Sequence, residues 1–202
     1  MITKPNFEYE EQAWAQGYED VAGVDEAGRG PLAGPVVAAS VMLPEDRCII
    51  GVNDSKKLTA KKREELYEYI MKYAIVGVGM MDNNEIDQWN ILTATKKAMR
   101  EAVLAMNPKP DYILVDGPIT IYANTNQEPI INGDAKSMSI AAASIVAKVT
   151  RDKIMEDLHE IMPIYGWNTN KGYGTKEHRE AIKIYGPSMF HRRSFKGVAE
   201  YA

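Results

Sequence analysis

The sequence predicts an α/β domain of three layers around a mixed sheet, and two observations favour this class. Apolar runs indicate three strands interrupted by a helix, then two more strands that helices precede or follow. The chain of 202 residues is 45% hydrophobic, which is enough for one sizeable core. We therefore expect a single domain spanning residues 1–202.

Two neighbouring runs predict the first strands. Val21–Asp25 is apolar and ends at acidic residues, and the β-branched run Val36–Leu43 follows Pro35 as its expected hairpin partner. Residues 1–20 are polar with scattered aromatic side chains, which fits either a short docking helix or a disordered segment. Residues 44–56 are expected to form a loop.

The middle of the chain alternates helix and strand signals. Leu58–Tyr73 places apolar and aromatic residues on one helical face, and Ile75–Met81 is the third predicted strand. Asp82 and Glu85 have the three-residue spacing of a capping box. They open a predicted long helix that ends near Met106, before a proline.

The remaining elements are two short strands and two helices. Tyr112–Val115 is an apolar strand, and Ile130–Ile131 is a fifth, very short one. Ser139–Ile161 predicts a long helix with an Ala-rich first half, and Thr175–Tyr185 predicts another that stops at Gly-Pro. Residues from about 163 to 202 should form a helical C-terminal appendage.

Composition narrows the function classes. The net charge is −4, whereas a protein that holds nucleic acid by phosphate attraction alone is usually basic. The charge therefore argues against a passive nucleic-acid binder, but not against a nuclease whose acids are partly neutralised by metal. Cys48 is the only cysteine, so an internal disulfide is impossible and a cytoplasmic location is expected. The N-terminus lacks an apolar signal core, and no run approaches the ~20 apolar residues of a membrane span. We expect a monomer without membrane contact.

The segment Val-Asp-Glu-Ala-Gly-Arg-Gly, residues 24–30, is the most informative. Asp25 and Glu26 are adjacent carboxylates that repel one another, so a cation is needed to offset their charge. Magnesium and manganese prefer carboxylate oxygens. Arg29 stands between Gly28 and Gly30, where the backbone can approach a ligand and the guanidinium can bind a phosphate. This combination suggests phosphodiester chemistry.

Two further acids complete the candidate set. Asp116 ends a predicted strand, and Asp134 lies between Gly133 and the long helix. Ligand sites collect at strand ends in α/β sheets. The simpler alternative, a turn former or helix N-cap, remains open and is strongest for Asp134.

Seven motifs together resemble ribonuclease HII, in the right order from about residue 20 to residue 197. They are Val24–Pro35 (VDEAGRGPLAGP), Asp54–Leu58 (DSKKL), Leu114–Gly117 (LVDG), Gly133–Lys136 (GDAK), Ala142–Asp152 (AASIVAKVTRD), Gly172–His178 (GYGTKEH) and His191–Phe195 (HRRSF). The resemblance implies a ribonuclease H-like fold with a five-stranded sheet. It also implies endonucleolytic cleavage of RNA in RNA–DNA hybrids and on the 5′ side of single ribonucleotides embedded in DNA, leaving 5′-phosphate and 3′-hydroxyl ends.

The resemblance also assigns a metal site. It implies that Asp25, Glu26, Asp116 and Asp134 hold two divalent ions, manganese or magnesium, when substrate is bound. One ion would activate the attacking water and the other would stabilise the leaving 3′ oxygen. We expect Asp25 to be shared by both ions.

Substrate contacts are implied as well. Gly28, Arg29 and Gly30 would meet the ribose, whose 2′-hydroxyl distinguishes RNA from DNA; a plain tight turn is the alternative. Tyr173, between two glycines, would pack on the deoxyribose after the scissile phosphate, or else serve as a partly buried anchor.

Basic and polar residues in the motifs are weaker candidates. The phosphate contacts suggested are Lys56, Lys57, Arg192 and Arg193, although a run of charge is usually a solvated face. Lys136 and Ser137 are candidate nucleic-acid backbone contacts. His159 and His178 show no metal-ligand spacing, and we assign them no role.

Two rival readings stay open. Ribonuclease HIII shares the fold and the four acids, but it is expected to carry an extra N-terminal domain and a different residue where Arg29 stands. A resolvase-like binding module of another class would ignore the 2′-hydroxyl. An all-DNA duplex discriminates between that module and a ribonuclease.

Overall fold

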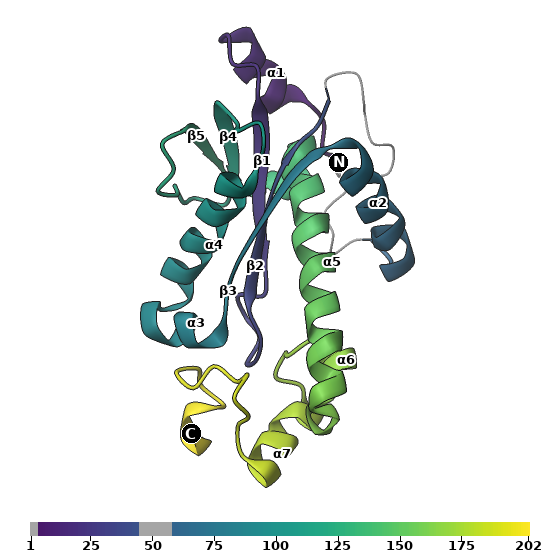
Figure 1. Ribbon diagram of the computed structural model, residues 1–202, viewed down its shortest axis with the longest axis vertical. Helices are drawn as coiled ribbons and strands as arrows, with labels where there is room; N and C mark the ends of the chain where they lie inside the picture. Colours follow the sequence, from purple (N-terminus) through teal and green to yellow (C-terminus); the bar gives the residue numbers. More distant parts are fainter. Residues whose placement is uncertain (1–3, 45–57) are drawn as a thin grey trace.

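The computed structural model describes residues 4–44 and 58–202, and it is built on a five-stranded mixed sheet. The strands are β1 (Val21–Ala27), β2 (Val36–Met42), β3 (Ile75–Met81), β4 (Tyr112–Asp116) and β5 (Asn126–Ile130). Their order is β3-β2-β1-β4-β5, with β1, β2 and β3 antiparallel and β1, β4 and β5 parallel (Figure 1). The predicted mixed sheet is confirmed.

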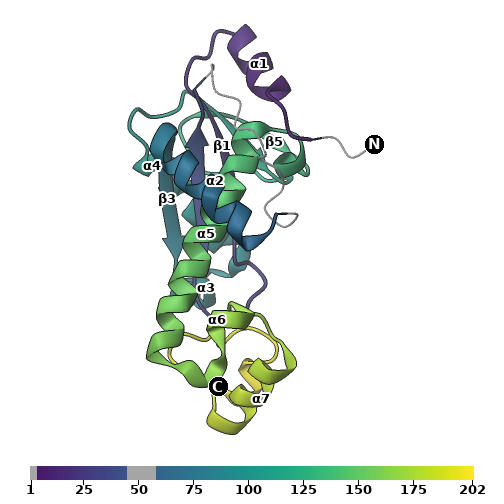
Figure 2. The ribbon, with the colours of Figure 1, turned by 90° about the vertical axis from the view of Figure 1, so that its right-hand side faces the viewer.

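Helices cover both faces of this sheet. They are α1 (Glu8–Ala15), α2 (Ala60–Tyr73), α3 (Asn83–Trp89), α4 (Ile91–Ala105), α5 (Met138–Ile161), α6 (Trp167–Asn170) and α7 (Lys176–Tyr185). Figure 1 shows α3 and α4 on one side of the strands and α5 on the other, and Figure 2 shows α2 and α5 crossing that second face. The three predicted layers are therefore present.

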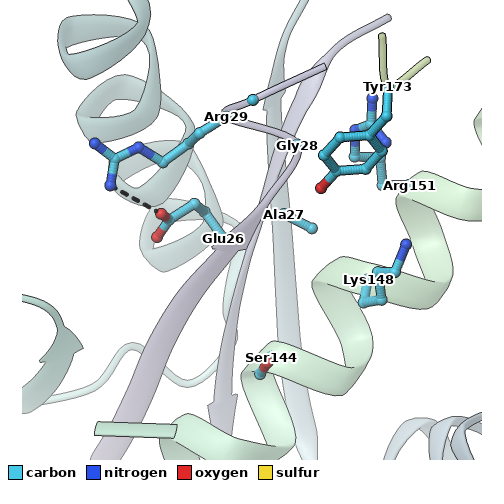
Figure 3. A pocket seen from close by; sticks show the side chains of 9 residues that line it. Glu26, Ala27, Gly28, Arg29, Ser144, Lys148, Arg151 and Tyr173 are labelled. Atoms are coloured by element: carbon cyan, nitrogen blue, oxygen red, sulfur yellow. Dashed lines mark hydrogen bonds and ion pairs between the residues drawn. The ribbon is translucent and has the colours of Figure 1, made fainter. Parts of the chain in front are cut away.

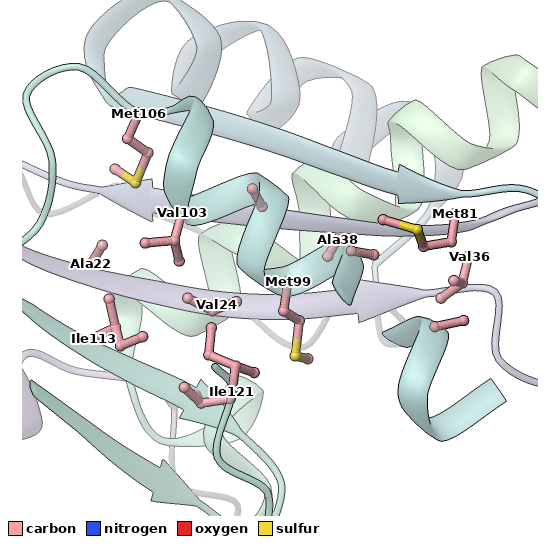
Figure 4. Packing of buried hydrophobic residues seen from close by; sticks show 14 of the residues in the cluster. Ala22, Val24, Val36, Ala38, Met81, Met99, Val103, Met106, Ile113 and Ile121 are labelled. Carbon is pink, nitrogen blue, oxygen red and sulfur yellow. The ribbon is translucent and has the colours of Figure 1, made fainter. Parts of the chain in front are cut away.

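The core lies on both sides of β1 and β2. On one face, Val24 and Ala38 pack against Met99 and Val103 of α4 (Figure 4). On the other face, the apolar side chains of β2 meet the Ala-rich first half of α5. Burial of these apolar side chains stabilises the layers, and the strand that carries the candidate acids runs between them.

Gly23 sets the distance between β1 and α5. A Cβ atom at Gly23 would lie 2.2 Å from Ile140 N, so the two backbones touch where the helix crosses the strand. Only glycine permits this approach. The close crossing brings α5 beside Asp25, two residues further along β1.

The predicted long helix after β3 is two helices. The capping box of Asp82 and Glu85 forms as predicted at the start of α3. At Asn90, however, φ is 67°, and the side chain of Asn90 accepts a hydrogen bond from Thr93 N to cap α4. Asn tolerates this left-handed conformation and supplies its own cap, so the helix stops and restarts.

The fifth strand is longer than predicted and begins upstream of its apolar end. Asn126–Ile130 contains polar residues and a proline, and it forms the outer edge of the sheet beside β4. Proline and polar side chains are tolerated on an edge strand, where one side forms no ladder. An apolar pattern therefore detects only its last residue.

The two ends of the described chain pack against α5. The docking helix expected within residues 1–20 is α1, whose buried Glu10 accepts hydrogen bonds from Ser137 Oγ (2.7 Å) and Ser139 N (2.8 Å). At the other end, Trp167 and Tyr165 stack in a separate apolar cluster with Leu32. Among the described residues, no helix has the length and apolar character required to cross a membrane.

Candidate active site

Three of the four predicted acids are gathered by the parallel pairing of β1 and β4. Val24 pairs with Val115, so the next residues of the two neighbouring strands, Asp25 and Asp116, lie side by side. Asp116 Oδ1 accepts a hydrogen bond from Gly133 N at 2.6 Å, which ties the segment preceding α5 to the end of β4. The parallel strands thus bring acidic groups together toward their carboxyl ends, as the sequence predicted.

Asp134 lies in the short 3-10 turn Gly133–Ala135 and is 7% exposed. It does not cap α5, because Ser137 accepts the hydrogen bond from Ile140 N (3.1 Å) in that role. The alternative reading of Asp134 as the N-cap of the long helix is therefore wrong. This acid stays a candidate ligand.

Electrostatics disfavour charge on the adjacent pair. Burial raises the pKa of Asp25 well above its usual value, and the neighbouring charges of Glu26 and Asp116 raise it further. Burial also raises the pKa of Glu26, although Arg29 opposes this shift. A divalent cation would reverse the penalty, since it favours the ionised carboxylates.

The donor set fits a hard divalent ion, because every candidate ligand is a carboxylate. As they stand within the described residues, no three of these side chains form a closed cage. Glu26 is paired with Arg29 (Oε1 to Nη1, 3.3 Å), and Asp116 is bonded to Gly133. Ion binding at Glu26 Oε1 would therefore compete with Arg29, whereas the Gly133 N–H leaves the second oxygen of Asp116 open to an ion.

A cavity of about 240 Å³ adjoins Glu26, one of the four acids. Its walls are Glu26, the loop residues 27–30, Ser144, Lys148, Arg151 and Tyr173 (Figure 3). Tyr173 is 46% exposed, and its ring lies over Gly30, where an added Cβ would be 3.6 Å from Tyr173 Cε1. The predicted acid, glycine loop and aromatic residue therefore share one cavity.

Gly28 is required by its surroundings. Its φ of +97° is unfavourable for residues with a side chain, and a Cβ would lie 2.0 Å from Arg151 Nε. The tight-turn reading and the ribose-contact reading are both compatible with this geometry. The ribose contact of Gly28, Arg29 and Gly30 stays a prediction.

Arg192 corrects one prediction. Its guanidinium is fully buried and donates to Gly28 O (2.6 Å), Arg29 O (3.0 Å) and Gly34 O (3.0 Å). Burial lowers its pKa to about 9. Its position in a basic run had suggested a phosphate contact. Because the guanidinium is buried and holds the glycine loop by its carbonyl groups, it is not available to a phosphate on the surface.

Ser137 corrects a second prediction. The residue is fully buried, its hydroxyl donates to Glu10, and its N–H donates to Gly133 O (2.8 Å). Together with its capping role, these bonds place it in the fold rather than at a nucleic-acid surface. Lys136 and Arg193 are exposed and stay candidates, whereas Lys56 and Lys57 lie outside the described residues.

Sequence reasoning missed three cavity residues on α5. Ser144, Lys148 and Arg151 follow one another at spacings of four and three, which places them on one helical face. Arg151 is 1% exposed and donates to Pro35 O (2.9 Å), Ala33 O (3.2 Å) and Lys171 O (2.9 Å). Applying helical periodicity to the AASIVAKVTRD motif would have revealed this face.

Comparisons with known proteins show a family resemblance over most of the chain. The family model described as ribonuclease HII matches residues 22–198. A ribonuclease HII from Geobacillus sp. (strain WCH70) is 55% identical over 193 residues, covering 95% of this chain and 69% of that relative.

Solved structures resemble it in three dimensions. The structure of the PCNA:RNase HII complex from Archaeoglobus fulgidus matches with a TM-score of 0.77 and 32% identity, over 88% of this chain and 96% of that one. Bst-RNase HIII in complex with Mn²⁺ matches with a TM-score of 0.72 and 20% identity, over 90% of this chain and 68% of that one. The second likeness shows the fold alone.

Proposed function

The chain belongs to the ribonuclease HII family, and from this we propose that it cuts DNA duplexes at single embedded ribonucleotides as well as hybrids. As a member it is a metal-dependent endoribonuclease that degrades RNA in RNA–DNA hybrids. We place cleavage on the 5′ side of the ribonucleotide, leaving a 5′-phosphate and a 3′-hydroxyl.

Asp25, Glu26, Asp116 and Asp134 would hold two divalent ions, magnesium or manganese. When bound, such ions supply activation of the attacking water and charge stabilisation at the leaving 3′ oxygen. Asp25 is the candidate shared ligand, since it is 5% exposed and adjoins both Glu26 and Asp116 in the field that raises its pKa. The Gly133 N–H holds Asp116 in a fixed orientation.

The substrate side of the proposal rests on the glycine loop. Arg192 binds the carbonyls of Gly28 and Arg29, so the loop backbone is preorganised before a ligand arrives. A fixed backbone can hydrogen-bond a ribose 2′-hydroxyl with little entropic cost. Tyr173, across the cavity, would pack on the deoxyribose that follows the scissile phosphate.

One observation carries the proposal: a single cavity is bounded by Glu26 of the acidic strand, the glycine loop and an exposed tyrosine (Figure 3). A general phosphodiesterase would need the acids alone. The added loop and aromatic ring are the features expected of an enzyme that reads a sugar and its neighbour.

The decisive experiment compares a DNA duplex containing one ribonucleotide with the same duplex entirely in DNA, in magnesium or manganese. We expect a cut 5′ to the ribonucleotide and no cut in the all-DNA duplex. Cleavage of long hybrids only would favour specificity like that of ribonuclease HIII. Cleavage of the all-DNA duplex would favour a resolvase-like activity, and no cleavage of any duplex would contradict the proposal.

A further inference from the structure

Two histidines that the mechanism does not use are buried beneath the Tyr173 loop. His178, in the first turn of α7, and His191 are both fully buried. Their Nε2 atoms are 3.0 Å apart, and His178 Nδ1 is 2.8 Å from the carbonyl oxygen of Tyr173. The pair therefore connects the C-terminal segment directly to a residue of the cavity wall.

The surrounding donors fix where the imidazole protons lie. Ser188 N–H donates to His191 Nδ1 (2.9 Å), so a neutral His191 carries its proton on Nε2 and donates it to His178 Nε2. Trp167 Nε1–H donates to that same His178 atom (3.1 Å). His178 must therefore carry its own proton on Nδ1, from which it donates to the Tyr173 carbonyl.

Only one arrangement of two neutral rings satisfies all four contacts. Burial lowers the pKa of His178 and lowers that of His191 to about 3, which agrees with neutral rings at physiological pH. Ser188 N–H and Trp167 Nε1–H can only donate hydrogen bonds, so these two groups set the direction of the other bonds.

The loop that receives this hydrogen bond needs an external support. Lys171 (φ 50°) and Gly172 (φ 83°) both have left-handed backbones immediately before Tyr173. Glycine adopts such a φ freely, but at Lys171 it is unfavourable, so neighbouring groups must hold that residue in place. Arg151 bonds the carbonyl of Lys171 (2.9 Å), and His178 bonds that of Tyr173.

We propose that His191 and His178 are positioning residues that aim Tyr173 at the sugar following the cleavage site. This inference rests on the proposed function, in which Tyr173 senses the RNA-to-DNA junction. The histidines do not touch substrate. They act through the Tyr173 carbonyl, which fixes the loop and hence the direction of the ring over Gly30.

Two substitutions at one position separate the donor from the acceptor of His178. In His178→Asn the amide nitrogen can occupy the place of Nδ1 and donate to Tyr173, but nothing replaces Nε2. In His178→Gln the amide oxygen can accept from Trp167 and His191, but the side-chain donor to the Tyr173 carbonyl is lost and only Thr175 N–H (2.8 Å) remains on it. The two variants are therefore matched in polarity and differ in the end of the ring that they imitate.

The readout is the ratio of cleavage rates for an embedded ribonucleotide and a long hybrid, measured with thermal unfolding. Tyr173→Ala is the reference and should lower this ratio by about tenfold, which corresponds to ~1.4 kcal/mol. We expect His178→Gln to lower it to a similar value and His178→Asn to keep it within about threefold of the original.

The outcomes separate this inference from the function on which it rests. If Tyr173→Ala leaves the ratio unchanged, the role proposed for Tyr173 is wrong. If Tyr173→Ala lowers the ratio but His178→Gln does not, the positioning role is wrong and the proposed function stands. If both His178 variants lower the cleavage ratio to the same extent and both lower the unfolding temperature, the role of His178 is purely structural.

A measurement on the unaltered protein does not depend on the variants folding. Imidazole ¹⁵N shifts distinguish the two neutral tautomers, and at pH 7 we expect a proton on Nδ1 of His178 and on Nε2 of His191. A charged ring, or the opposite tautomer at His178, would overturn the proposal.

Discussion

Arg29 Nη1 lies 3.3 Å from Glu26 Oε1, so the cation of the glycine loop is paired with one of the proposed metal ligands. The pair is partly solvated, with 48% of the Arg29 side chain and 13% of the Glu26 side chain exposed. An ion that binds Glu26 through Oε1 would compete with Arg29, and Arg29 also lines the cavity, where its guanidinium could bind a phosphate. Metal binding and phosphate binding are thus linked through one side chain.

Arg29→Ala should therefore strengthen the binding of divalent ions while weakening that of nucleic acid. A partly exposed ion pair contributes about 0.2–1 kcal/mol, so we expect the affinity for Mn²⁺ to rise by no more than about fivefold. Titration calorimetry with Mn²⁺ measures the first effect. Arg29→Lys, which keeps the charge, is the control, and weaker Mn²⁺ binding by the alanine variant would contradict the linkage.

Asp25→Asn should abolish cleavage without loss of stability. The folded-state pKa of Asp25 is raised, so its ionised form lowers stability at pH 7, and this loss is regained as pH falls. A neutral amide of the same shape removes that penalty, and the unfolding temperature should stay equal or rise. We expect activity to fall by more than about 100-fold, because substitution of a residue that only hydrogen-bonds to a metal ligand usually costs up to about 100-fold.

Asp157→Asn, an exposed position on α5, is the matched control for this change. It should leave both activity and unfolding temperature unchanged. Near-normal turnover by Asp25→Asn would remove this residue from the proposed site.

Alanine should destabilise the fold at Arg192 and have almost no effect at the neighbouring Arg193. Arg192→Ala leaves three carbonyl groups without their donor and should lower the free energy of unfolding by about 2–4 kcal/mol. Arg193 is exposed, so Arg193→Ala should change the free energy by less than about 0.5 kcal/mol. Urea unfolding measures both values, and a stable Arg192→Ala would contradict the bracing role.

Stability should fall in mild acid because of the buried histidine pair. The pKa of His191 is lowered to about 3 in the fold, so protons bind the unfolded chain first as pH falls below its usual value near 6.5. At pH 5 this difference costs about 2 kcal/mol. The raised pKa values of Asp25 and Glu26 have the opposite effect, because these two acids make the fold more stable as pH falls. Their contribution to the free energy of unfolding must be removed by comparison with a variant.

His191→Gln provides that comparison. The carboxylate contribution is common to both proteins, so the drop in unfolding free energy between pH 7.5 and pH 5 should be smaller in the variant by about 2 kcal/mol. Equal drops in the two proteins would show that His191 is not buried in its neutral form.

The sequence predicted best what depends on neighbouring residues. The strand ending in Asp25 and Glu26 was visible because an apolar run precedes the two acids, and the capping box at Asp82 is a local signal. The break at Asn90 was missed because helical residues surround it, and the choice between one helix and two depends on packing against the sheet.

Long-range contacts could not be predicted in the same way. Arg192 looks like part of a basic run, and only the folded chain shows that its partners are carbonyls far upstream. Ser137 likewise received its role from Glu10, at a separation of 127 residues. Side chains that serve distant backbone groups leave no pattern of spacing in the sequence.

The bond between Arg192 and the glycine loop also sets an order of events during synthesis. Arg192 is 164 residues downstream of Gly28, whose carbonyl it holds. All four acids leave the ribosome before this arginine does, so a nascent chain can carry the complete set of candidate metal ligands while its loop is still unbraced. The contact that braces the glycine loop can therefore form only after translation has passed Arg192.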